Sequence, residues 1–258
     1  MDFYTFGLSL DPHAVHQRHM LDDESDEEQD AETPSVDPQL QITPEWSVSQ
    51  IRLLLCAVGE EAAIFIKTHI LPPDLKPVSH MTCSQSDVIL ERTSGPNDHN
   101  ISELYTFKDV GVCLHTRPLK QQFVTAWSQK LMSTVCPKEV VILTSVHHYE
   151  YIASDPSSVV MPHARCLRTR HFKQDTGVPL LEPPNFLKGE AAAILTHCEV
   201  HHLPGYLQVH YTSKLDISAV QSFKTVPLNL FGIVVQQQTP EDKIRRMLPK
   251  ESLSMLYT

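Results

Sequence analysis

The sequence of 258 residues is long enough for one large domain or two small ones, and its apolar content of 41% can supply a sizeable core. Residues 1–44 hold eleven acidic side chains and one basic residue, Arg18, a net charge of −10, so residues 45–258 are electrically neutral. A neutral folded part offers no basic stripe for nucleic acid, and a total of only 8 glycines argues against phosphate-binding loops.

The first segment, residues 1–44, is predicted to be a disordered acidic tail. Nine acidic residues and no basic one lie between Asp22 and Asp37, and proline recurs towards the end of the segment. Such a composition cannot bury enough apolar area to offset the chain entropy. The predicted organisation is a tail over 1–44, an α/β domain over 45–235, and a polar C-terminal tether over 236–258, which carries the candidate docking motif.

Short apolar runs and amphipathic stretches alternate in the first half of the domain. Ile51–Val58 ends at Gly59, which predicts a buried strand, and a helix follows from Glu60 until the prolines at 72–73. The clearest helix opens at Pro118, because apolar residues then recur at steps of three and four. Further strands are predicted over residues 87–92, 104–107, 110–115 and 138–144.

The same alternation continues in the second half, after a stretch, residues 147–174, with no clear pattern. Glu190–His202 is predicted to be a helix, and the strict alternation of Tyr206–Tyr211 indicates a strand with one wetter face. Two last helices are predicted over 216–223 and 239–247. Recurrent strand–helix order predicts an α/β fold: a single domain with a central, mainly parallel sheet layered by helices.

The six cysteines are scattered, and no C-x-x-C pair occurs among them. No basic leader opens the sequence, and no apolar run approaches the roughly 18 residues that a membrane span needs. We interpret the cysteines as small buried hydrophobic residues of a reducing compartment. The prediction is a soluble, cytoplasmic protein, with nuclear or endoplasmic-reticulum association left open.

Histidine is abundant, at 15 residues, which raises the question of metal and acid–base sites. His197 and His201 lie four apart on one helix face, but Cys198 stands where a zinc-protease motif needs glutamate. His147 and His148 follow a strand, a position typical of catalytic groups in α/β folds. No nucleophile elbow, Walker loop or dinucleotide motif accompanies them. We therefore expect no metal, no cofactor and no catalytic residue.

The C-terminal tripeptide is the candidate binding motif. Leu256 offers apolar area, Tyr257 offers a ring with a hydroxyl at its tip, and Thr258 carries the terminal carboxylate. Recognition pockets capture free carboxylates in this way, and tyrosine anchors are common at interfaces. The alternative is that the tyrosine packs back on its own domain.

Five stretches together resemble one known family. They are Pro179–Asn185, Ala192–His201, Tyr206–Thr212, Leu215–Ile217 and the closing Leu-Tyr-Thr. In these stretches the chain closely resembles the proteasome assembly chaperone 1 family. The similarity is strong over roughly residues 165–225 and at the C-terminus, and thin over the first 130 residues.

The resemblance implies a non-catalytic chaperone of the proteasome core particle. Members of this family pair with a related protein, proteasome assembly chaperone 2, as a heterodimer. The heterodimer scaffolds the ring of proteasome α-type subunits and prevents off-pathway dimerisation of α rings. The resemblance further implies that Leu256, Tyr257 and Thr258 form a hydrophobic–Tyr–X motif that docks between α subunits, and that the fold is phosphorylase/hydrolase-like without its catalytic groups.

An enzyme of phosphorylase-like fold that uses histidine acid–base or metal chemistry is the alternative. Cys113 and His115 lie on one strand face, although a nucleophile needs a base brought to it by the fold. An enzyme should gather several of His115, His147, His148 and His163 in one concave pocket. A scaffold should instead show a broad apolar patch.

Overall fold

The computed structural model describes residues 39–47, 50–84, 100–153, 160–236 and 241–248. The strands are β1 Gln39–Thr43, β2 Leu53–Val58, β3 Ser79–Ser84, β4 Asn100–Phe107, β5 Val110–His115, β6 Glu139–His147, β7 His163–Arg168 and β8 Gly205–Thr212. The α-helices are α1 Glu60–His69, α2 Gln121–Val135, α3 Gly189–Val200, α4 Ile217–Ser222 and α5 Glu241–Met247. Short 3-10 helices cover His148–Glu150, Phe223–Thr225 and Leu228–Phe231.

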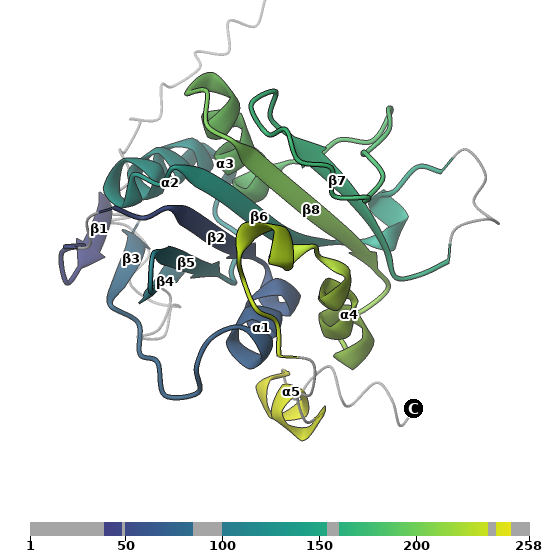
Figure 1. Ribbon diagram of the computed structural model, residues 1–258, viewed down its shortest axis with the longest axis horizontal. Coiled ribbons are helices and arrows are strands. Elements are labelled where there is room, and N and C mark those ends of the chain that lie inside the picture. Colours follow the sequence, from purple (N-terminus) through teal and green to yellow (C-terminus); the bar gives the residue numbers. More distant parts are fainter. Residues whose placement is uncertain (1–38, 48–49, 85–99, 154–159, 237–240, 249–258) are drawn as a thin grey trace, which may run out of the picture. The chain divides into compact units, whose positions relative to one another are not determined.

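The described strands form one eight-stranded mixed sheet in the order β1-β3-β4-β5-β2-β6-β8-β7 (Figure 1). Four neighbouring strands at its centre, β5, β2, β6 and β8, are parallel to one another. Antiparallel strands extend this core on both sides, β4, β3 and β1 on one and β7 on the other. Five strands, β2, β3, β5, β6 and β8, thus run in one direction, and the predicted α/β class with a layered central sheet is confirmed.

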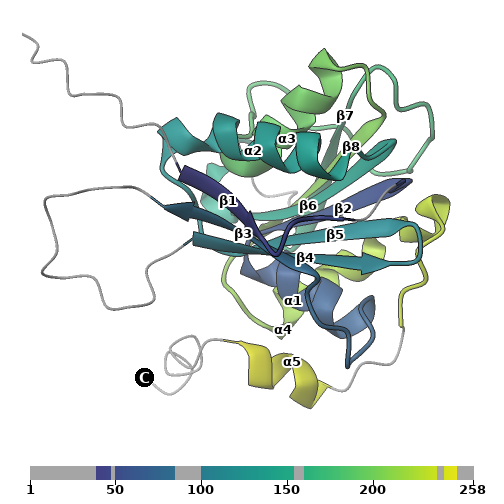
Figure 2. The same ribbon diagram turned by 90° about the vertical axis from the view of Figure 1, so that its left-hand side faces the viewer.

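Helices cover both faces of the sheet (Figure 2). Helices α2 and α3 pack together on one face, with Trp127 and Ile194 in the core beneath them. Helices α1, α4 and α5 cover the other face, where Phe65 and Phe223 are fully buried. The central position of β2 explains its apolar sequence. Because helices cover both faces of the sheet here, side chains at consecutive positions of this strand are buried.

Helix α2 begins later than predicted, at Gln121 rather than at Pro118. Lys120 is extended and serves as the N-cap residue. The preceding amide, that of Leu119, donates a hydrogen bond to the Glu190 carboxylate of α3. This tertiary contact holds residues 118–120 outside the helix, whereas proline placement alone favoured an earlier start.

The prediction of disorder is wrong for the last part of residues 1–44. Gln39–Thr43 forms β1, which pairs with β3 in antiparallel register, Gln39 opposite Ser84 and Thr43 opposite His80. Leu40 and Ile42 alternate with polar residues and pack against the core under α2. Alternation of apolar and polar residues is the ordinary pattern of a strand with one covered face. The prediction of disorder rests on the acidic residues that precede this strand and does not use the alternation. Residues 1–38 lie outside the described part of the chain.

The prediction of a wetter face on Tyr206–Tyr211 is also wrong, because every residue of β8 is buried. The polar side chains of this strand satisfy one another beneath α4. The Tyr206 hydroxyl donates to Gln208 Oε1 at 2.7 Å, and the Gln208 amide lies 2.9 Å from His210 Nε2. Since His210 Nε2 accepts there, its Nδ1–H donates to the Ser222 hydroxyl at 2.9 Å.

The predicted helix over 239–247 corresponds to α5, which contacts α1 and α4. Ile244 of this helix is fully buried in the core cluster with Phe65. The part of the predicted tether that is described therefore belongs to the folded domain. The predicted strand over 87–92 and the motif at 256–258 lie outside the described residues.

Candidate functional site

One cavity lined by described residues lies at the carboxyl ends of the central parallel strands. It measures about 320 Å³, and β2, β5, β6 and β8 each contribute to its lining. The loop after β6 and the loop before α3 complete its walls. In open α/β sheets, ligands bind outside the carboxyl ends of the strands, so this is where an active site is expected.

His115, at the end of β5, lies in the floor of this cavity and is almost completely buried. Trp127 Nε1 donates to the Ser102 hydroxyl at 3.1 Å, and this hydroxyl lies 2.9 Å from His115 Nδ1. On the other side of the ring, His115 Nε2 lies 3.6 Å from Glu190 Oε1, so the imidazole lies between the Ser102 hydroxyl and the Glu190 carboxylate.

Glu190 stands in the first turn of α3 and is buried beside this ring. Burial by itself would raise the pKa of its carboxyl group. The contact with His115 and the hydrogen bond from the Leu119 amide nevertheless hold that pKa below its ordinary value. The resulting carboxylate ties α3 to the end of β5 and to the segment that precedes α2.

The enzyme alternative predicts that several of four histidines gather in one pocket, and this cavity gathers two of them. His115 and His147 line it, whereas His148 and His163 do not belong to its lining. The His147 ring is stacked on Tyr149, with ring centroids 4.1 Å apart. His163, on edge strand β7, is stacked on Tyr211 with centroids 4.9 Å apart.

Each candidate nucleophile near these histidines is buried or occupied. Ser102 and Cys113 have no exposed surface. Cys113 lies against Cys56, and that contact together with burial raises the pKa of the Cys56 thiol. Ser145, in the cavity lining, donates its hydroxyl proton to Glu61 Oε2 at 2.6 Å. None of these three side chains is therefore an exposed nucleophile held against a histidine base.

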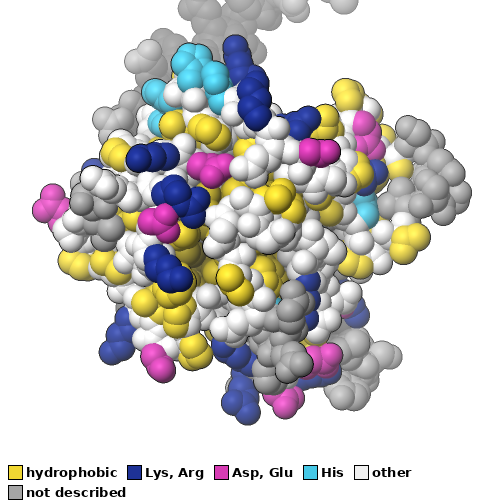
Figure 3. Space-filling model, in the orientation of Figure 1, with side chains coloured by type: hydrophobic (Ala, Val, Ile, Leu, Met, Phe, Trp, Pro, Cys, Tyr) yellow, Lys and Arg dark blue, Asp and Glu magenta, His cyan; other side chains and the backbone are white. Residues whose placement is uncertain are grey.

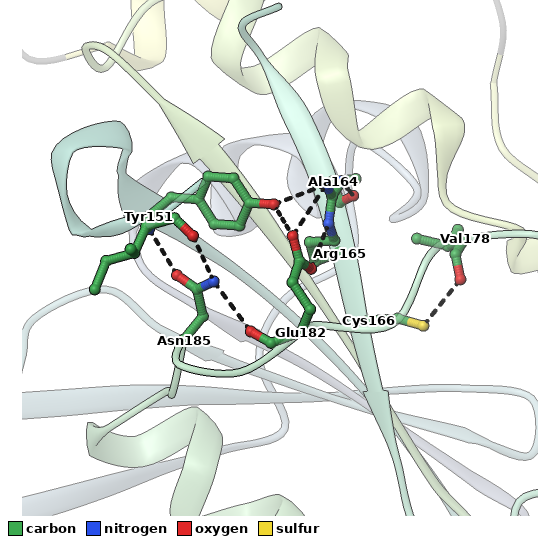
Figure 4. A network of polar contacts seen from close by, with 8 residues as sticks. Tyr151, Ala164, Arg165, Cys166, Val178, Glu182 and Asn185 are labelled. Carbon is green, nitrogen blue, oxygen red and sulfur yellow. Dashed lines mark hydrogen bonds and ion pairs between the residues drawn. The ribbon is translucent and has the colours of Figure 1, made fainter. Parts of the chain in front are cut away.

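A polar network fixes the two loops that wall the cavity (Figure 4). Glu182 accepts a hydrogen bond from the Tyr151 hydroxyl and pairs with Arg165 Nε at 3.0 Å. Burial raises the pKa of Glu182, but hydrogen bonds from Arg165 and Tyr151 outweigh it and lower that pKa to about 2. Asn185 joins the loops directly, since its amide accepts from the Ile152 amide at 2.7 Å and donates to the Ile152 carbonyl at 3.0 Å.

Large apolar side chains stand exposed on these same two loops. Tyr149, Ile152 and Phe186 are 74%, 58% and 76% exposed, and the latter two line the cavity mouth. These apolar side chains are thus exposed to solvent on loops whose backbone is fixed by hydrogen bonds. Exposed apolar side chains around a cavity are the pattern of an interaction surface.

His197 of α3 and His201, the C-cap residue that follows the helix, lie close together, although α3 ends at Val200 and not at the predicted His202. The rings of His197 and His201 are 4.1 Å apart between centroids, near the end of the helix. Burial, together with the neighbouring His201, lowers the pKa of His197. Within the described ranges, no group of three or more His, Cys, Asp or Glu side chains is arranged to hold a metal ion.

The candidate binding motif, Leu256, Tyr257 and Thr258, lies outside the described residues, so its docking stays a prediction. The Glu190–His115 contact and the Tyr151–Glu182–Arg165 network are features that the sequence did not reveal. Their members lie far apart along the chain, and no short motif connects them. Among the described residues, no helix is both long and apolar enough to cross a membrane.

Comparison with known proteins links this architecture to one group. The family model PAC1, described as "Proteasome assembly chaperone 4", matches residues 15–258. Proteasome assembly chaperone 1 of Nematostella vectensis is 28% identical over 204 residues, which cover 72% of this chain and 79% of that protein. The human protein of the same name is 34% identical over 141 residues, 51% of this chain and 49% of the human one.

A solved structure shares the fold at low sequence identity. PbaA of Pyrococcus furiosus, an archaeal homolog of proteasome-assembly chaperone, superposes with a TM-score of 0.57 at 14% identity. The superposition covers 84% of this chain and 96% of PbaA. At this identity the similarity supports the fold alone.

Proposed function

We propose, from the premise that this chain belongs to the PAC1 family of proteasome assembly chaperones, that it is a non-catalytic chaperone for assembly of the proteasome core particle. The match of the family model to residues 15–258 is the observation that carries this proposal. The sheet architecture shared with PbaA is compatible with it.

The proposed partners are the α-type subunits of the proteasome and a related chaperone, proteasome assembly chaperone 2, with which the chain forms a heterodimer. In this proposal the heterodimer scaffolds the α ring and prevents α rings from dimerising prematurely. The exposed side chains of Tyr149, Ile152 and Phe186 support a role in binding proteins. When a partner covers exposed apolar groups, their removal from water lowers the free energy of the complex.

Catalysis is not part of the proposed function. The cavity with His115 and His147 is the observation that favours an enzyme, but the buried hydroxyl of Ser102 and thiol of Cys113 cannot reach a substrate. His115 also directs its Nε2 side towards Glu190. No metal is expected, and elemental analysis of the purified chain that found one zinc ion per molecule would contradict this part of the proposal.

The C-terminal motif is proposed to dock between α subunits. Burial of the Tyr257 ring contributes about 1.5–3 kcal/mol. A hydrogen bond from a partner cation to the Thr258 carboxylate contributes a similar amount, about 1.5–3 kcal/mol. Loss of either group should weaken binding by about ten- to a hundredfold, since 1.4 kcal/mol corresponds to about tenfold.

The experiment compares three chains, each co-expressed with α-type subunits and the related chaperone. Tyr257→Ala removes the ring, and one residue appended after Thr258 displaces the carboxylate while it keeps the ring. Native mass spectrometry of the wild type should show complexes with both partners, and both variants should lose α subunits but keep the related chaperone. A wild-type chain that recovers no α subunit would refute the assembly role. Equal recovery by all three chains would refute docking through the motif alone.

A further inference from the structure

A second surface lies where β7 ends and has a lining distinct from that of the cavity. A groove of about 470 Å³ runs between Leu167–Lys173 and the adjacent Leu180–Leu181. The segment around Leu180 lies beside β7 as an added strand: Cys166 donates to the Pro179 carbonyl at 2.8 Å, and Leu181 donates to the Cys166 carbonyl at 2.9 Å. We infer that this groove binds an acidic peptide segment of a partner protein, one that also presents an apolar side chain.

Three basic side chains, Arg168, Arg170 and Lys173, line the groove and are exposed. Arg170 pairs with Glu199. Arg168 and Lys173 form no ion pair with any described carboxylate. They are held instead by backbone carbonyls: Arg168 Nη1 lies 3.3 Å from the Gln174 oxygen, and Lys173 Nζ lies 2.6 Å from the Arg170 oxygen. Their charges are therefore available to a ligand with carboxylates.

Two acidic residues lie close to these cations, and both already have hydrogen bonds. Glu199 accepts from the Arg170 backbone amide at 2.9 Å as well as from its side chain. Asp175 Oδ1 accepts from the Gly177 amide at 3.1 Å, which closes the turn that follows Lys173. Neither carboxylate pairs with Arg168 or Lys173. The groove thus complements negative charge, whereas residues 45–258 as a whole are electrically neutral.

The turn that carries the cations is built rigidly. The buried Thr169 side chain donates to the Leu203 carbonyl and accepts from the Gly205 amide, both at 2.9 Å. Phe172 is buried, with its ring 5.4 Å from that of Tyr206. Because these contacts hold the turn, the cations lose less conformational freedom when a ligand binds. In Figure 3, basic side chains stand beside histidines at the upper edge of the face that is shown.

The groove also has an apolar part. Leu180 is 53% exposed, and it lines the groove together with Phe172 and Leu181, which are buried beneath it. A cationic rim over an apolar floor fits a peptide with both carboxylates and one apolar side chain. A nucleic acid would use the cations but leave Leu180 exposed.

The test titrates the full-length chain against fluorescein-labelled Glu-Glu-Leu-Glu-Glu and reads fluorescence anisotropy. Binding is expected at about 50 mM salt and should weaken at about 0.5 M salt, where exposed charges are screened. Arg168→Glu combined with Lys173→Glu should weaken it by at least about tenfold. Leu180→Ser should weaken it by several-fold and leave its salt dependence unchanged.

The matched control is Lys130→Glu combined with Lys138→Glu, which makes the same change of charge at two other exposed lysines. This control should bind the peptide nearly as the wild type does. Four outcomes would overturn the inference: no binding to the wild type, an equal loss in the control, equal binding of Gln-Gln-Leu-Gln-Gln, or tighter binding of a single-stranded oligothymidine. Circular dichroism of each variant shows whether a loss of binding reflects a loss of fold.

Discussion

Replacement of His210 by glutamine should remove a defined part of the acid sensitivity of this fold. His210 is almost completely buried on β8, where Gln208 and Ser222 hydrogen-bond its neutral ring. Burial, with a smaller contribution from the nearby His163, lowers its pKa from 6.5 to about 3. The folded protein therefore excludes a proton that the unfolded chain binds below pH 6.5.

The pKa values of His210 in the unfolded and the folded protein determine how its protonation changes stability with pH. The unfolded chain binds more protons, so stability falls as the pH decreases from about 6.5 towards about 3. At pH 5 the unfolded ring lies about 1.5 pH units below its pKa, which corresponds to about 2 kcal/mol at 1.36 kcal/mol per unit. This contribution is present in full above about pH 7.

The assay is urea denaturation of the wild type and His210→Gln at pH 7.5 and pH 5. His210→Gln should have a lower free energy of unfolding than the wild type at both pH values. The decrease in its free energy of unfolding from pH 7.5 to pH 5 should, however, be smaller than that of the wild type by about 2 kcal/mol. Ser222→Ala is the control: it removes a hydrogen bond of the ring, lowers stability by about 1–3 kcal/mol at both pH values, and keeps the wild-type pH dependence. An identical loss between the two pH values for wild type and His210→Gln would refute the reasoning.

Three further predictions concern stability and are measured as thermal or urea midpoints. Deletion of residues 1–38 should leave the thermal midpoint nearly unchanged, because a segment of this charged composition does not pack on a domain. Deletion of residues 1–44 also removes β1 from the sheet and should lower the thermal midpoint by several degrees. Equal midpoints for the two deletions would show that β1 contributes nothing to stability. Ile244→Ala should lower the free energy of unfolding by about 2–4 kcal/mol, because this side chain is fully buried. The same change at the exposed Arg245 should lower it by less than about 0.5 kcal/mol. Similar losses for the two variants would mean that α5 does not pack on the domain. Glu190→Gln should cost about 1.5–3 kcal/mol, since it removes the charge that accepts from the Leu119 amide and faces His115, and an unchanged midpoint would contradict that role.

Local patterns in the sequence determined most of the elements. The apolar run at Leu53–Val58 specified a buried strand because a central strand needs apolar residues on both faces. The three- and four-residue spacing around Trp127 specified a helix with one buried side, since 3.6 residues complete a turn. The family also followed from the sequence, because the stretches from Pro179 onwards preserve enough identity for the resemblance to be seen, and the family model then matched most of the chain.

The tertiary structure decided which polar residues are buried and which side chains meet. Alternation in β8 predicts a strand whose polar face meets water, but the packing of α4 against that face buries Gln208 and His210. Likewise, the sequence around Glu190 indicates only the start of a helix. The structure brings it to His115 and to the Leu119 amide, 71 residues earlier in the chain, and so sets the start of α2. Periodicity records only whether a side chain faces the core or not, whereas the partners within the core depend on how distant segments fold against one another.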